Sequence, residues 1–465
     1  MVEQLQARSV RRPGLLLVLM CSVQFLNVAN ISSVNIALPD IAAGLGFSEA
    51  TLPWVVSAYL LTFAGFLLVS GRVADLVGRR KVLTTGLSVF AACAVLNCLA
   101  ISAAMLVASR AVQGVGAAMA IPASLGILTS TFTERAERSR AVAAFGAAGA
   151  VGFAAGLILG GLVTDPLGWR WVFGLTVVPA ALLLALTFLL VPRDTGAGGG
   201  RVDVVGALLA TLGLLGFVFA LTNAGRSGWA AAPTLVALAG GAALIGTFLL
   251  RQARVPEPLM PFRVWRRPGF AAVMGIGFCN FAAWVGANFF LSLTLQRVLG
   301  YTPTRAALAL LPLALGGLVF ATLAGRLLPR TGARPLLVAG LTGYAAGFAL
   351  LALTTETSGY WLHVLPAILL AVAGNATTFV ASNVVALAHA PGDEQSLVGG
   401  LFNTSMQVGG GLGLAIMSAV AAARIGDDTS AALLPGYQAA FWTAVALAGL
   451  ALLITVVFVH ARAQR

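Results

Sequence analysis

Long apolar runs are the feature that most constrains the fold of this chain. About fourteen of them follow one another, each about twenty residues long, and nearly all charged residues lie between them. About 20 apolar residues in a helix cross the ~30 Å hydrocarbon core of a bilayer, whereas barrel strands would alternate over about 10 residues. Hydrophobic residues make up 59% of the sequence, more than a water-soluble domain can bury. The sequence therefore predicts an all-α polytopic membrane protein.

The apolar runs fall into groups of six, two and six. A glycine-rich segment at 195–200 follows the sixth run, and a segment rich in arginine and proline at 251–267 follows the eighth. We predict an N-terminal six-helix bundle in 1–192, cytoplasmic linkers and two extra helices in 193–267, and a C-terminal six-helix bundle in 268–465. The predicted spans are 14–38, 53–71, 82–101, 104–127, 140–163, 170–191, 204–223, 232–250, 270–294, 304–325, 335–354, 362–387, 397–421 and 437–459.

The distribution of positive charge predicts how the chain is oriented in the membrane. The net charge is +13, and most of the 28 lysine and arginine residues lie on the side of the N-terminus. By the positive-inside rule that side is cytoplasmic, and an even number of spans places both termini there. The basic residues are thus explained by topology, without a nucleic-acid partner. The basic residues on the other side are Arg170, Arg226, Arg297, Arg305 and Arg424.

A short basic turn between the second and third runs has a degraded copy later in the chain. The first turn runs from Gly71 to Lys81 and the copy begins at Gly325, with a second glycine seven positions on in each case, at Gly78 and Gly332. A turn repeated at corresponding places in two halves indicates a duplicated transporter.

The first turn has two interpretations. Asp75 precedes the third span, where a helix N-terminus favours a carboxylate, and it can pair with Arg79 or Arg80. The turn could simply anchor and cap the helices. Alternatively, it could stabilise one of two conformations, and the presence of a copy favours this second role. The predicted conformational gate comprises Gly71, Asp75, Gly78, Arg79, Gly325 and Gly332.

These segments resemble a known family, the major facilitator superfamily. The turn resembles its motif A, and RAVQGVG at 110–116 resembles its motif B. Four further segments resemble its fourteen-span drug:proton antiporter branch, and together the matches span nearly the whole chain. They are NIALP at 35–39, WVVSAY at 54–59, LQRVLGYTP at 295–303 and FNTSMQVGG at 402–410.

Arg110 is the basic residue that falls inside a predicted span. A charge at that depth is costly and marks a candidate functional site. The alternative is that its long side chain extends to the outer headgroups. Gln113 and Gly114 on the same stretch favour an inward-facing role. The family resemblance implies that Arg110 faces a central cavity and takes part in proton coupling with Gln113.

The fifth span carries a glycine face formed by Gly152, Gly156 and Gly160, followed by Gly161. Small residues four apart allow two membrane helices to pack backbone to backbone. The pattern resembles motif C, the antiporter signature of the family, although Leu157 stands where that motif has proline.

The aspartates and glutamates all lie in loops or at span ends. Asn30 stands where the family's first span commonly has an aspartate. A buried carboxylate would be the natural partner of a cationic drug, so its absence predicts a neutral or anionic substrate. Proton coupling would then use Asp40, Asp75 or an indirect route.

Polar residues inside the spans predict the substrate-binding site. Asn280, Trp284 and Asn288 form a stripe on the ninth span, and an aromatic ring there suits an apolar ligand with polar edges. Each of these residues could instead hydrogen bond to another helix. The predicted binding residues are Asn27, Asn30, Asn280, Trp284, Asn288, Asn375, Thr378 and Asn403.

The sequence therefore predicts a secondary exporter of small amphipathic compounds, such as drugs or antibiotics. It would be a monomer in a bacterial cell membrane, driven by protons, working by alternating access. A dedicated metabolite or lipid transporter and a non-transporting sensor or scaffold are the alternatives. No ATP-binding, hydrolase or metal motif is present, so no enzyme activity, cofactor or metal is expected.

Overall fold

The computed structural model describes residues 13–194, 202–267, 269–388, 395–425 and 430–459. Fourteen helices of these residues are long and apolar enough to cross a membrane, which confirms the all-α prediction. The glycine-rich segment 195–200 and both termini lie outside the described residues. The first group of helices is α1 (Pro13–Leu45), α2 (Trp54–Val77), α3 (Arg79–Cys98), α4 (Ala103–Thr131), α5 (Arg135–Leu167) and α6 (Arg170–Leu190).

Nine further helices and two π-helical segments complete the described chain. The central ones are α7 (Val204–Ser227), α8 (Ala232–Gln252) and the short α9 (Phe262–Trp265), which the sequence analysis missed. The last group is α10 (Phe270–Leu293), η2 (Thr294–Val298), α11 (Pro303–Thr331), α12 (Ala333–Ala352), η3 (Tyr360–Val364), α13 (Leu365–Ala388), α14 (Gln395–Ala422) and α15 (Ser430–Phe458).

Two helices extend beyond their predicted ends and continue through a proline. The first span was predicted to stop at residue 38, but α1 continues through Pro39 to Leu45, and α11 passes Pro329 to reach Thr331. Pro39 and Pro329 each remove one backbone donor. Within a membrane bundle, packing against neighbouring helices retains a helix that proline would end in water.

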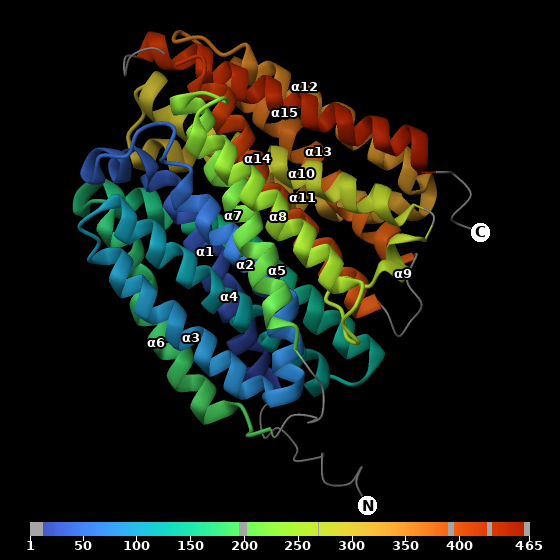
Figure 1. Ribbon diagram of the computed structural model, residues 1–465. Coiled ribbons are helices and arrows are strands. Elements are labelled where there is room, and N and C mark those ends of the chain that lie inside the picture. Colours follow the sequence, from blue (N-terminus) through green and yellow to red (C-terminus); the bar gives the residue numbers. More distant parts are fainter. Residues whose placement is uncertain (1–12, 195–201, 268, 389–394, 426–429, 460–465) are drawn as a thin grey trace, which may run out of the picture.

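The helices form two bundles with a helix pair against their junction. Helices α1–α6 pack together and α10–α15 pack together, and α7 contacts both α2 and α14 (Figure 1). Leu61 of α2, Val218 of α7 and Ala415 of α14 form one small apolar cluster. The pair α7–α8 therefore belongs to neither bundle but contacts both.

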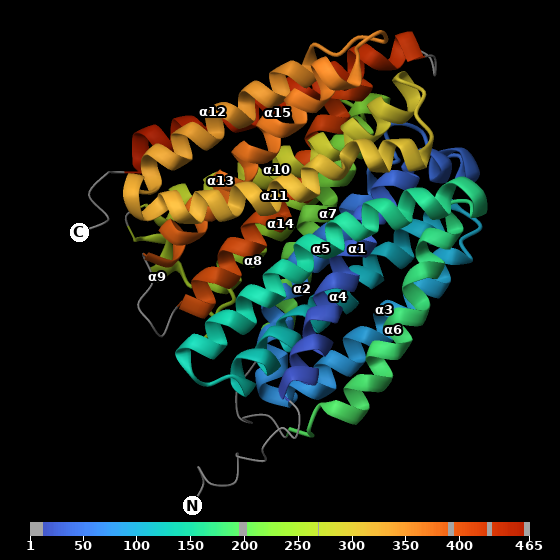
Figure 2. The same cartoon turned by 180° about the vertical axis from the view of Figure 1, so that it is seen from behind.

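The two ends of the molecule differ in how the bundles meet. We call the end with the loop 46–53 the Glu49 end, and the end with the α2–α3 turn the Asp75 end. At the Glu49 end, Leu38 of α1 shares one apolar core with Leu293 of α10 and Leu310 of α11. A separate core fills the Asp75 end of the second bundle. Helices α5 and α11 accordingly meet at the Glu49 end and separate toward the other (Figure 2).

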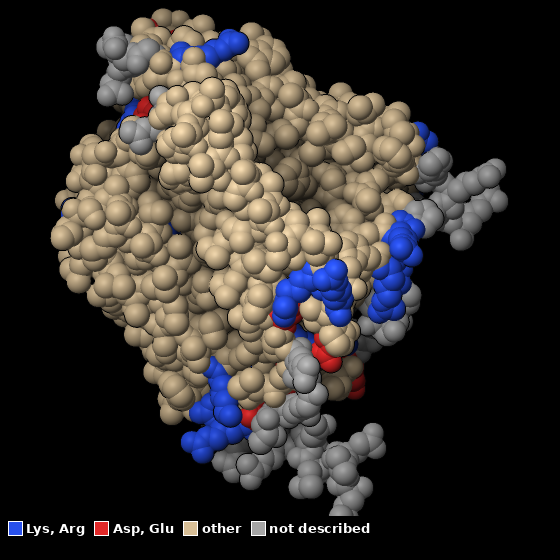
Figure 3. Space-filling model, viewed as in Figure 1, with Lys and Arg blue, Asp and Glu red and all other residues tan. Residues whose placement is uncertain are grey.

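Charge is concentrated away from the apolar belt of the molecule. In Figure 3, lysine and arginine side chains gather along the lower and right margins, and a broad surface without charge lies between these and the few at the top. The exposed residues of this belt are apolar, for example Val178, Leu189 and Val236. The surface thus has the pattern of a protein embedded in lipid.

Candidate functional site

Arg110 is buried inside the first bundle, with 1% of its surface exposed. Its Nη1 donates to Asn30 Oδ1 at 2.7 Å and to Gln113 Oε1 at 2.8 Å, and its Nε donates to the Val55 carbonyl at 3.1 Å. These partners come from α1, α4 and α2 respectively. The burial excludes the alternative in which Arg110 extends to the headgroups.

Aromatic rings and further amides complete the surroundings of Arg110. The Tyr59 ring centroid lies 4.4 Å from the guanidinium carbon, a distance at which a ring face attracts a cation. The Tyr59 hydroxyl donates to Asn27 Oδ1, and Asn97 Nδ2 donates to Gln113 Oε1 at 2.9 Å. The sequence analysis named Asn27 and Gln113 but missed Tyr59 and Asn97. Tyr59 ends the WVVSAY segment and Asn97 interrupts an apolar run, so each carried a signal that was not used.

The electrostatic balance of this cluster is unusual because no described carboxylate contacts Arg110. Its charge is met by neutral amide and carbonyl oxygens and by aromatic faces, which compensate a buried cation less fully than an anion does. Asn30 Nδ2 and Gln113 Nε2 are buried donors without a hydrogen-bond partner among the described residues. The cluster therefore presents an unmatched cation and two spare N–H groups, and it favours negative or strongly polar groups.

The predicted polar residues of the second bundle form a smaller cluster. Asn280 Nδ2 donates to Asn375 Oδ1 at 2.9 Å, and Tyr344, which the prediction missed, donates its hydroxyl to the Asn280 carbonyl at 3.0 Å. The Oγ1 of Thr378 is buried without a partner among the described residues. No hydrogen bond between described residues joins this cluster to Arg110.

The other predicted binding residues are not brought together. Asn288 turns back to its own helix and donates to the Trp284 carbonyl at 2.8 Å, while Trp284 is half-buried. Asn403 is exposed on α14. Asn280, Trp284 and Asn288 therefore lie on one helix face by their spacing, but hydrogen bonds do not join their side chains into one group.

The turn between α2 and α3 is built differently from the prediction. Asp75 lies in the last turn of α2 and pairs with Arg79 at 2.9 Å, as expected, but it does not cap α3. Instead, the carboxylate of Asp194, after α6, accepts from the backbone amides of Arg79 at 2.6 Å and Arg80 at 3.2 Å. Arg79 also donates to the Gly126 carbonyl at 2.6 Å. The turn therefore connects α2, α3, α4 and the end of α6.

The four glycines of the predicted gate have different structural roles. Gly78 has φ +113°, and a Cβ there would lie 2.9 Å from the Asp194 carbonyl oxygen. Gly332 also has a positive φ, +79°. A Cβ at Gly71 would make an ordinary contact at 3.7 Å, and one at Gly325 would meet nothing within 4 Å. Gly71 therefore does not lie in close contact with a neighbouring backbone.

The glycine face of α5 packs against α1. A Cβ on Gly152 would lie 2.5 Å from the Phe25 carbonyl oxygen, and one on Gly160 would lie 2.8 Å from Ser33 Cα. Gly156 faces the same helix at Ala29. Gly161 instead faces the second bundle, where its Cβ would lie 2.7 Å from Ala307 Cβ. The face thus positions α1, which carries Asn30, and its last glycine contacts the other bundle.

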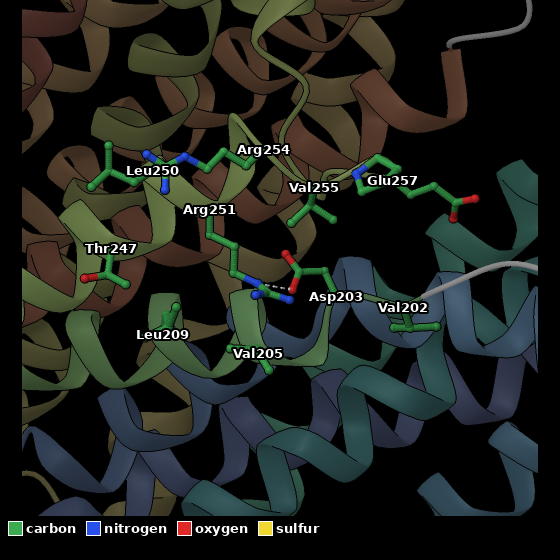
Figure 4. Close-up of a pocket in the computed structure, with 11 residues that line it drawn as sticks. Val202, Asp203, Val205, Leu209, Thr247, Leu250, Arg251, Arg254, Val255 and Glu257 are labelled. Atoms are coloured by element: carbon green, nitrogen blue, oxygen red, sulfur yellow. Dashed lines mark hydrogen bonds and ion pairs between the residues drawn. The ribbon is translucent and has the colours of Figure 1, made fainter.

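A surface pocket lies apart from these clusters, at the Asp75 end between α7, α8 and the loop that follows (Figure 4). It measures about 980 Å³ and contains Asp203, which accepts from Arg251 Nε and from Gln252 Nε2, each at 2.7 Å. Burial alone raises the pKa of Asp203, but hydrogen bonds from Arg251, the Gly206 amide and Gln252 bring it below its usual value. These contacts join the ends of the α7–α8 hairpin, and none of the predicted site residues lines the pocket.

Two six-helix bundles in the membrane, joined through one core at one end and holding a buried cation in the first bundle, define a class of duplicated polytopic membrane protein. The Major Facilitator Superfamily model matches residues 20–414 and 273–465. The chain belongs to this superfamily.

Several relatives match nearly the full length of the chain. The puromycin resistance protein of Streptomyces alboniger is 37% identical over 454 residues, covering 95% of this chain and 89% of that protein. The cephamycin export protein of Amycolatopsis lactamdurans is 38% identical over 414 residues, covering 87% and 84%. A bacterial homologue of the human lysosomal transporter Spinster, solved inward-facing and occupied, has the same fold with a TM-score of 0.70, 16% identity, and 95% and 96% coverage.

Proposed function

We propose that this protein exports small amphipathic antibiotics or drugs, preferring neutral or anionic compounds, by proton-driven alternating access. The observation that carries the charge preference is the contact between Arg110 and Asn30 Oδ1, because an amide leaves the buried cation unmatched. Relatives named for puromycin resistance and cephamycin export support the substrate class.

The proposed mechanism requires two states of the bundles. The shared core and the Asp165–Thr304 hydrogen bond support a state that is closed at the Glu49 end, so a substrate would enter from the Asp75 end. A compound enters between the bundles, a polar or anionic group is attracted toward Arg110, and rocking exposes the site to the other side. The proposed setting is a monomer in a bacterial cell membrane, with both termini cytoplasmic, where most arginines lie.

Transport into inside-out membrane vesicles tests this proposal. Energised vesicles that contain the protein should accumulate a cephamycin, which carries a carboxylate, more strongly than puromycin, which carries an amine. A protonophore should stop the uptake. Uptake that persists after the proton gradient collapses would remove proton antiport, and a preference for the amine would remove the charge argument.

The contribution of Arg110 is tested separately in the same vesicles. Arg110→Ala should abolish uptake while the protein remains folded, because the charge that attracts the substrate is lost. Arg138→Ala, an exposed arginine in the first turn of α5, is the matched control and should transport normally. Uptake by Arg110→Ala at the control rate would assign Arg110 a structural role only.

A further inference from the structure

The carboxylate of Glu49 links the two bundles at the Glu49 end. Glu49, in the loop between α1 and α2, forms an ion pair with Arg297 of η2, and the two side chains are 12% and 23% exposed. The Tyr437 hydroxyl of α15 donates to the other carboxylate oxygen, Oε2, at 3.2 Å. One side chain of the first bundle therefore contacts two elements of the second.

Both partners of this ion pair are held in place by local structure. The Ser48 amide donates to Thr51 Oγ1 at 3.0 Å while the Thr51 amide donates to the Ser48 carbonyl at 2.9 Å, which fixes the turn around Glu49. Arg297 lies in a π-helical turn, a distortion that is frequent at functional sites. The preceding residue, Gln296, donates to the Ile36 carbonyl of α1 at 3.1 Å. Consecutive side chains of η2 thus contact the first bundle.

The neighbouring contacts between the bundles have no matched opposite charges. Ser292 Oγ donates to the Asn35 carbonyl at 2.8 Å. Asp165 accepts from the backbone amide of Thr304 at 3.0 Å, and Thr304 Oγ1 donates to the Gly161 carbonyl at 3.1 Å. A proton would leave the donors and acceptors of the serine and glutamine contacts unchanged. Glu49–Arg297 is the ion pair among these contacts. A single proton on Glu49 would neutralise the carboxylate and leave the charge of Arg297 unpaired.

We propose that Glu49 is a proton-binding residue of the transport cycle, which holds the Glu49 end closed when ionised and releases it when protonated. A proton from the outer solution binds the Glu49 carboxylate and removes the negative charge opposite Arg297. It returns to that solution when the Glu49 end closes again. The open form lacks Arg297 beside the carboxylate, so it binds the proton more strongly than the closed form. By linkage, acid outside shifts the population toward the outward-open form.

This inference rests on the proposed function, because opening toward the outside is the step at which an exporter releases its substrate. The charged and titratable groups that contact Glu49 are Arg297 and Tyr437. Arg305 at this end lies over the Tyr301 ring instead. Other described groups at the same end are Asp40, Asp165, Arg170, Glu356, Tyr360, His363 and Arg424.

Distances between spin labels on the two bundles test the proposal without substrate or gradient. Ile101 and Leu362 are 85% and 93% exposed and lie at the Glu49 end on opposite bundles, so cysteines there can carry the labels. The background is full-length protein in lipid nanodiscs, with the four native cysteines replaced by serine. Between about pH 7 and about pH 3.5, a range that spans the ordinary titration of glutamate near about 4.3, the fraction with long distances should rise severalfold.

Two variants decide the outcome. Glu49→Gln should have a raised long-distance fraction at every pH and little further response to acid. Asp165→Asn, which alters the other carboxylate between the bundles, is the matched control and should retain the pH response. The proposal is overturned if Glu49→Gln responds to pH as the parent protein does, or if Asp165→Asn is the variant that loses the response.

An exchange of charges separates this role from a general loss of structure. Glu49→Arg alone should open the Glu49 end, and adding Arg297→Glu should restore closure together with its pH response. Failure of the exchange to restore either property would also contradict the proposal. Because no transport is measured, a negative result here would leave the export experiment to be judged independently.

Discussion

At the scale of single residues, Asn30 determines how the charge of Arg110 is balanced. Its Oδ1 accepts from the guanidinium at 2.7 Å, in the position where an aspartate would form a buried ion pair. An ion pair would neutralise the cation, whereas the amide leaves it available to a substrate group. The charge preference of the transporter is therefore expected to depend on this one side chain.

Asn30→Asp should shift selectivity toward cationic compounds, since the new carboxylate neutralises Arg110. We expect the ratio of cephamycin to puromycin uptake to fall about tenfold, equivalent to ~1.4 kcal/mol. Vesicle uptake of both compounds measures it. Asn383→Asp, at a half-buried position on α13, is the matched control and should leave the ratio unchanged. An unaltered ratio in Asn30→Asp would contradict the proposed role of Asn30 in charge preference.

The backbone conformation at position 78 requires glycine, whereas the one at position 325 does not. The two glycines nevertheless belong to copies of one sequence motif. Gly78→Ala should destabilise the protein by about 1–3 kcal/mol, because φ is positive and the new Cβ would meet Asp194. Gly325→Ala should be neutral or stabilising, because it lies inside α11 with open space around it. Thermal unfolding in detergent compares the two, and equal losses would contradict this distinction.

At the scale of helices, the glycine face of α5 sets the position of α1 and thereby of Asn30. Gly156→Val should cost about 1–3 kcal/mol, because a Cβ at Gly156 would lie 2.7 Å from Ala29 Cα and the two backbones would have to separate. Gly146→Val on the same helix meets nothing within 4 Å and is the matched control. Thermal unfolding measures both, and uptake should fall only in the first. Similar stability of the two variants would show that α1 can move without cost.

The α7–α8 hairpin is joined by Asp203, and its stability should depend on pH. The native pKa of Asp203 lies below the unfolded value of about 3.9, so the stabilisation is complete above that value and is lost as pH falls through the native pKa. Asp203→Asn should lower the melting temperature near neutral pH and flatten its decline below about pH 4. If the melting temperature of Asp203→Asn declines with acid as that of the parent does, the pH dependence arises from another group.

At the scale of the whole molecule, contact of the bundles at the Glu49 end should limit which state is populated. Gly161→Leu introduces a side chain where a Cβ would already lie 2.7 Å from Ala307 Cβ, so α5 and α11 should be forced apart. The labels at 101 and 362 should then report longer distances at every pH. Gly146→Leu, which faces open space on the same helix, should not change them. Unchanged distances in Gly161→Leu would mean that the bundles close without this contact.

The fourteen membrane-spanning helices were predictable from the sequence alone. Each membrane span depends on about 20 neighbouring residues that must all be apolar, so the information is local. The superfamily was also predictable, because its motifs are short continuous segments such as 71–81 and 110–116. The sequence also marked Arg110 as a charged residue inside a span, and the structure buries its side chain inside the first bundle.

Only the tertiary structure decided which residues meet across helices. It brought Asn97 to Gln113, placed Asp194 rather than Asp75 at the start of α3, and paired Glu49 with Arg297. These partners are separated by long stretches of chain, and hydrophobicity does not specify which polar groups on neighbouring helices face one another. Lipid-facing helix surfaces are almost entirely apolar, so each membrane helix can be recognised from its own stretch of sequence. The chemistry depends on the few polar contacts that packing between helices creates.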